Sequence, residues 1–134
     1  MDLENLVSLA DELKDKGHNV FLRNNEPGKL LFVHANPFQE ILCERYGNDI
    51  ALLDATYKTT KYSLPLFFVS VRTNCGYKVV ASFVIEQETT SAITEALQYV
   101  YQFLPFLRPK FWIVDYSEPE LTSIETVFKG VIFK

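Results

Sequence analysis

Three strand-like segments, residues 50–57, 64–72 and 77–86, follow one another with only short links, and this succession constrains the fold more than any other feature of the sequence. Each segment is rich in β-branched and aromatic residues, which favour strands. Because short links join strands that lie side by side, the succession predicts an antiparallel meander at the centre of the chain.

A different pattern follows the meander. Thr89 or Thr90 can cap a helix with a continuous apolar stripe along one side. Residues 111–114 then form a short apolar strand, a capping box at Ser117 begins a helix over residues 118–128, and a further strand starts at Val131. The sequence therefore predicts an α/β fold with a mixed sheet in the ribonuclease H-like order: three antiparallel strands, then βαβ units.

A helix and hairpin lead-in precedes the meander. Apolar residues at helical spacing predict a helix over residues 2–16, and two strand-like runs flank the turn signal Glu26-Pro27-Gly28. Pro37 can open a short helix in which Phe38, Ile41, Leu42 and Tyr46 share one face. We interpret residues 1–48 as this lead-in and residues 49–134 as the N-terminal portion of a domain that is truncated on its C-terminal side.

Composition excludes several classes of protein. A net charge of −4 over 134 residues disfavours a stand-alone nucleic-acid binder, which needs clustered Lys and Arg to neutralise phosphates. The apolar stretches are too short to cross a bilayer, so we expect no membrane partner. Cys43 and Cys75 have no second Cys or His at metal-ligand spacing, and we expect reduced packing thiols.

Two aspartates stand at the ends of apolar strands. Asp54 follows the triplet ALL and Asp115 follows WIV. In the predicted topology these two strands are parallel neighbours, so the carboxylates meet in a crevice at the sheet edge, where a shared Mg²⁺ or Mn²⁺ would relieve their repulsion. Alternatively the two residues are unrelated, with Asp54 holding a turn and Asp115 favouring the positive N-terminus of the next helix.

Three stretches carry a family resemblance: LLDATYKTTKYSLPLF, EQETTSAITEAL and WIVDYSEPELTSIETVFKG. In this order they resemble the transposase domain of Mutator-like elements, the MULE domain, over roughly residues 50–130. The resemblance implies a ribonuclease H-like fold and metal-dependent, DDE-type DNA transposition chemistry in the nucleus. Asp54 matches the first acid of the triad and Asp115 the second, and both are implied to be catalytic metal ligands.

The third acid of that family lies on a helix beyond the strand that starts at Val131, so we expect this chain alone to be catalytically incomplete. DNA would be bound through other parts of the parent protein. Glu86, Glu88 and Glu95 match no catalytic acid, and we expect them to be solvated or to cap the helix beside them. A competing interpretation is a domesticated, non-catalytic module that binds DNA or protein, for instance in transcription.

Overall fold

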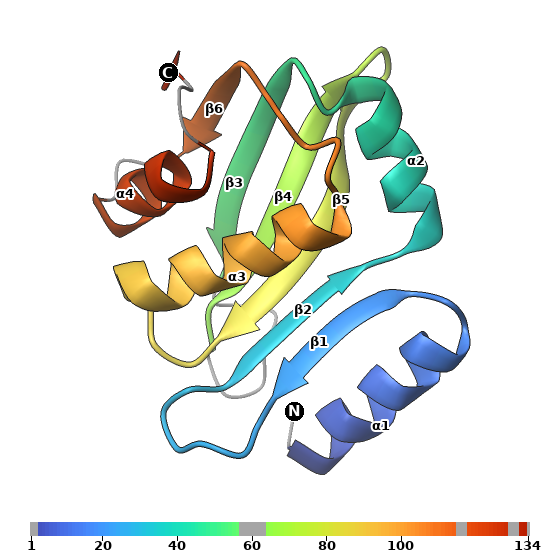
Figure 1. Ribbon diagram of the computed structural model, residues 1–134, viewed down its shortest axis with the longest axis vertical. Helices are drawn as coiled ribbons and strands as arrows, with labels where there is room; N and C mark the ends of the chain where they lie inside the picture. Colours follow the sequence, from blue (N-terminus) through green and yellow to red (C-terminus); the bar gives the residue numbers. More distant parts are fainter. Residues whose placement is uncertain (1–2, 57–63, 115–117, 129–131, 134) are drawn as a thin grey trace.

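The computed structural model describes residues 3–56, 64–114, 118–128 and 132–133 (Figure 1). The helices are α1 (Leu3–Asp15), α2 (Pro37–Tyr46), α3 (Thr90–Phe103) and α4 (Glu118–Val127). The strands are β1 (Asn19–Arg23), β2 (Leu31–Ala35), β3 (Ile50–Thr56), β4 (Leu66–Thr73), β5 (Gly76–Ile85), β6 (Phe111–Val114) and β7 (Ile132–Phe133). These bounds confirm the predicted order of elements, and most of them lie within two residues of the predicted ones.

The strands form one mixed sheet in the order β1-β2-β5-β4-β3-β6-β7. β3, β4 and β5 are the predicted antiparallel meander, and β6 and β7 follow in parallel. β3 therefore lies between β4 and β6 and runs parallel to β6, as the sequence predicted. β2 pairs with β5, so the hairpin of the lead-in extends the same sheet.

One face of the sheet carries the main core, which α2, α3 and α4 cover (Figure 1). The predicted stripe of α3 is confirmed, because Ile93, Ala96, Leu97 and Val100 are all fully buried. Phe67 of β4 and Phe83 of β5 stack beneath it with their ring centroids 4.7 Å apart. Thr89 caps α3 by accepting a hydrogen bond from the amide of Ala92.

The opposite face carries a smaller cluster under α1, which we call the α1 cluster. Leu6 and Ala10 of α1 are buried there against Leu30, Phe32 and Val84. Side chains alternate along a strand, so Phe32 points to α1 while its neighbours Leu31 and Val33 point into the main core. The two faces are thus covered very unequally.

Helix α2 begins as predicted, and its predicted apolar face packs in part. Asn36 caps it in a full capping box with Gln39. Leu42 and Tyr46 pack against the main core beside the buried Cys43, whereas Phe38 is 64% and Ile41 57% exposed. The C-terminal end of α2 lies close to the segment that follows α3, so there is room only for a small residue at this point. A Cβ at Gly47 would lie 2.7 Å from the carbonyl oxygen of Phe106.

The two cysteines are free and lie in different environments. Cys43 is a packing thiol, as expected, and burial raises its pKa to about 12. Cys75 is exposed in the tight turn between β4 and β5, so the prediction that it packs in the interior is wrong. The turn itself explains the difference, since a two-residue link projects its side chains into solvent.

Candidate functional site

Strand β3 presents Asp54 to solvent next to a fully packed neighbour. Leu53 is 1% exposed and belongs to the main core, whereas Asp54 is exposed and points to the opposite face. Its cross-strand partner on β4 is Phe68. The carboxylate therefore lies beside an aromatic side chain near the end of the strand.

The strand on the other side of β3 leads to the second predicted acid. Leu53 is directly paired with Val114, the last residue of β6, so the residues that precede the two aspartates are register partners. Asp115 lies outside the described residues, as do Ser117 of the predicted capping box and Tyr57 of the family motif. Of the two predicted ligands, the described structure thus includes Asp54.

The chemistry of Asp54 fits a hard divalent cation. In the described part of the chain its carboxylate has no hydrogen bond or ion pair. An exposed carboxylate of this kind can bind Mg²⁺ or Mn²⁺ together with water ligands. Among the described residues, no group of three or more His, Cys, Asp or Glu side chains could hold a metal ion. A complete cation site at Asp54 therefore needs a ligand from outside the described ranges.

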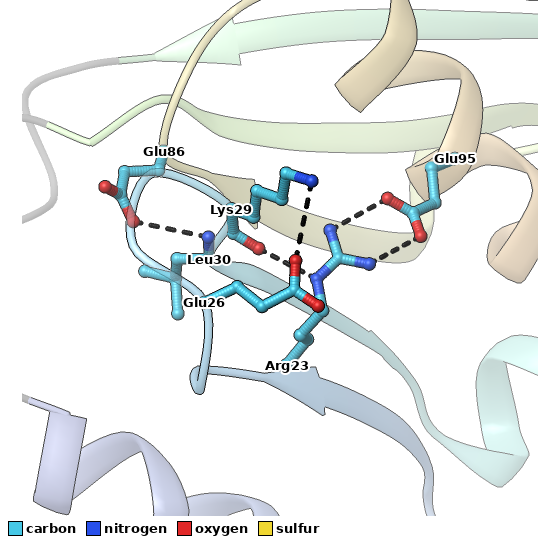
Figure 2. Close-up of polar contacts among 6 residues, drawn as sticks. All are labelled: Arg23, Glu26, Lys29, Leu30, Glu86 and Glu95. Atoms are coloured by element: carbon cyan, nitrogen blue, oxygen red, sulfur yellow. Dashed lines mark hydrogen bonds and ion pairs between the residues drawn. The ribbon is translucent and has the colours of Figure 1, made fainter.

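A polar hollow of about 410 Å³ lies beside the N-terminus of α3, between the turn of the lead-in hairpin and the end of β5. Figure 2 shows its central contact, in which Arg23 of β1 points its guanidinium fork at Glu95 of α3. The two Nη atoms lie 2.6 and 2.8 Å from the two carboxylate oxygens, and Nε donates to the carbonyl of Lys29. This bidentate pair joins the lead-in hairpin to the helix over the main core.

The remaining charges at the hollow are also satisfied within the protein. Glu86 accepts a hydrogen bond from the amide of Leu30, and Lys29 pairs with Glu26 (Figure 2). Hydrogen bonding to Arg23 lowers the pKa of Glu95, and the bond to Glu95 raises the pKa of Arg23. These contacts link the lead-in hairpin to β5 and α3 around the hollow.

These contacts change the interpretation of two glutamates. The sequence predicted that Glu86 and Glu95 are solvated or cap a helix. Glu86 is exposed, as predicted, and both side chains also bond to the lead-in hairpin. The available signal was Arg23, a charged residue at the end of an otherwise apolar strand. Sequence alone could not locate its partner, because Glu95 lies 72 residues away.

A second polar contact outside the predicted site joins two histidines. Nδ1 of His18, just after α1, lies 2.8 Å from Nε2 of His34 on β2. Both rings are partly buried, and burial together with the charge of His18 lowers the pKa of His34.

Comparison with family models, with curated proteins and with solved structures found no match for this chain. In the described ranges, no helix is both long and apolar enough to cross a membrane.

Proposed function

We propose that this chain is the N-terminal part of a ribonuclease H-like, DDE-type transposase domain of the Mutator-like class, which acts on DNA in the nucleus. Asp54 and Asp115 are its first two acids and bind Mg²⁺ or Mn²⁺. The observation that carries the proposal is the register of β3 and β6, in which the residues before the two aspartates are directly paired. The family assignment itself rests on the sequence resemblance.

The strand order supports the ribonuclease H-like class. An antiparallel meander whose first strand also pairs in parallel with the strand after the next helix is the arrangement that the sequence predicted. Strands β3 and β6 run in the same direction, so their carboxyl ends lie at the same edge of the sheet. This edge is where a mixed α/β sheet most readily forms a ligand site.

In the proposed mechanism, Asp54 and Asp115 act as ligands through their carboxylate oxygens and transfer no protons. Bound divalent ions would activate the attacking hydroxyl and stabilise the leaving oxygen of an in-line phosphoryl displacement. Leu53, fully packed behind Asp54, fixes the backbone from which the carboxylate projects. A third acid would come from outside this chain, so the chain alone binds the cation weakly and does not cut DNA.

A second candidate function is a non-catalytic protein-interaction module. The observation that favours it is a set of exposed apolar side chains beside α2, namely Phe38, Ile41 and Phe106, each more than half exposed. The net charge of −4 also suits a protein partner better than DNA.

The experiment that tests the proposed function is metal-dependent strand cleavage by the parent protein. Asp54→Asn and Asp115→Asn should each reduce cleavage by at least about a hundredfold, because metal ligands supply several kcal/mol of transition-state stabilisation. Asp11→Asn, an equally exposed acid on α1, is the matched control and should leave cleavage unchanged. Full cleavage by both variants would exclude the two acids from catalysis.

The isolated chain provides the complementary measurement. It should not nick supercoiled DNA with Mg²⁺ or Mn²⁺, because its cation site lacks the third acid. Metal-dependent nicking that either Asp→Asn change abolishes would contradict the claim of incompleteness. A parent protein that cleaves no DNA with any divalent cation would instead support the interaction module.

A further inference from the structure

The geometry of the two histidines distinguishes a hydrogen bond from a metal chelate. Their ring centroids are 5.1 Å apart and the ring planes differ by 21°, while the facing nitrogens are 2.8 Å apart. The centroid separation is the nitrogen–nitrogen distance plus the two ring radii, so both nitrogens lie on the line between the centroids. This in-line arrangement suits an N–H···N bond, whereas two rings that share a metal ion would meet at an angle.

An N–H···N bond between imidazoles depends on the protonation state. One nitrogen must donate and the other must accept, so at least one of the two rings has to be neutral. When both rings are protonated, both facing nitrogens are donors, and two positive charges lie in contact. The contact is therefore favourable with one proton between the nitrogens and unfavourable with two.

The positions of His18 and His34 determine which elements would separate if the hydrogen bond between them broke. His18 follows Gly17, which ends α1 with φ of 84°, and the His18 amide bonds back to the carbonyl of Leu13. His34 lies on β2, between Val33 and Ala35 of the main core. The hydrogen bond between the two histidines thus joins the end of α1, which covers the α1 cluster, to a strand of the central sheet.

Charged groups also lie on the elements around the pair. Lys16, just after α1, pairs with Glu12, and Asp15 is the last residue of α1. On α2, Glu40 bonds to Asn19, the neighbour of His18, and β5 places the neutral Ser82 opposite His34. Asp54 lies on the same face two strands beyond Ser82. Among the described residues, His18 is the charge that shifts the pKa of His34.

We propose that the bond between His18 and His34 is a pH-sensitive tie, which holds the end of α1 on the sheet at neutral pH and is broken by acid. Burial and His18 lower the pKa of His34 in the folded protein. The tie then contributes stability above the unfolded pKa of about 6.5, and this stability is lost as the pH falls through the folded pKa. The inference does not depend on the proposed cation site.

The chain is well suited to the test, because it contains just two histidines and a single tryptophan, the fully buried Trp112. Urea unfolding of the whole chain, followed by Trp112 fluorescence, is measured between pH 5 and 8. The control is the double variant His18→Asn with His34→Gln, whose amides can bridge the same positions but do not titrate. The midpoint of the wild type should fall more steeply below pH 6.5 than that of the control.

Imidazole NMR resonances supply the quantitative check. Each unit by which the pKa of His34 lies below the unfolded value should appear as a tenfold larger unfolding constant at low pH. Amide exchange at pH 5.5, corrected for intrinsic rates, should show protection lost in α1 and kept in α3. Equal pH dependence of wild type and control, an ordinary pKa for His34, or α1 protected as well as α3 would each overturn the proposal.

Discussion

The main core and the α1 cluster cover opposite faces of one sheet but are built differently. Helices α2, α3 and α4 bury side chains on many strands in the main core, where most residues are completely inaccessible. Among the described residues, the α1 cluster has five buried members, and partly buried leucines and a valine surround them. A polar contact supplements the packing there, because His18–His34 joins the end of α1 to β2. The Arg23–Glu95 pair instead joins β1 to α3.

Because of this difference, the two faces of the sheet should respond differently to the same type of substitution. A large, close-packed core transmits any loss to the whole domain, since its members share neighbours. A small cluster at the margin can open locally while the remainder stays folded.

Truncation in the main core should give the largest loss. Phe83→Ala removes a fully buried ring that stacks on Phe67, and comparable changes cost about 3–5 kcal/mol. This is a large part of the 5–15 kcal/mol that ordinarily stabilises a domain. Urea unfolding should show one transition at a much lower midpoint, whereas a loss below about 1 kcal/mol would show that the sheet is not close-packed there.

Truncation in the α1 cluster should cost less and act locally. Leu6→Ala removes a side chain that is 2% exposed, and we expect about 2 kcal/mol, the lower end for such changes, because a marginal site can collapse around the cavity. Amide exchange should accelerate in α1 and stay slow in α3. Uniform acceleration in both helices would mean that the two faces unfold as a single unit.

The ion pair at the polar hollow should contribute least. Arg23 and Glu95 are 23% and 35% exposed, so a double-mutant cycle with Arg23→Met and Glu95→Gln should give a coupling of about 1 kcal/mol. Because the folded pKa of Glu95 is lowered, this stability is present above the unfolded pKa and is lost as the pH falls through the folded pKa. Arg23→Met should remove that acid-dependent step.

The matched control for this pair is Arg72→Met. Arg72 bonds to Asp49 over a similar distance, 2.6 Å, but the two side chains are 49% and 47% exposed. Solvent screens such a pair, so its coupling should be close to zero. Equal couplings for the two pairs would show that the hollow adds no protection from solvent.

Local patterns predicted most of the fold. The stripe of α3, the cap at Thr89 and the turn between β4 and β5 are signals within a few residues, and each was confirmed. The pairing of β2 with β5 was not predicted, because hydrophobic alternation does not specify which edge a hairpin joins. The same limit applies to α2, where apolar spacing did not show that Phe38 and Ile41 stay exposed while Leu42 and Tyr46 pack.

Less of the candidate site could be predicted. The sequence placed Asp54 next to the strand of residues 111–114 because short meander links and a right-handed crossover leave few topologies. It missed the polar contacts of Arg23 and His18, since each joins side chains from distant segments and no local pattern encodes such a partner. Whether the two aspartates share a cation stays a prediction.

The most direct test of that claim is Mn²⁺-induced broadening of amide resonances in the ¹⁵N-labelled chain. If Asp54 and Asp115 bind one ion together, broadening should centre on residues 53–57 and 114–117. Asp54→Asn alone should then remove it from both segments, Asp115→Asn should do the same, and Glu86→Gln should leave it unchanged. Broadening centred elsewhere, or broadening that persists around one aspartate when the other is replaced, would contradict a shared site.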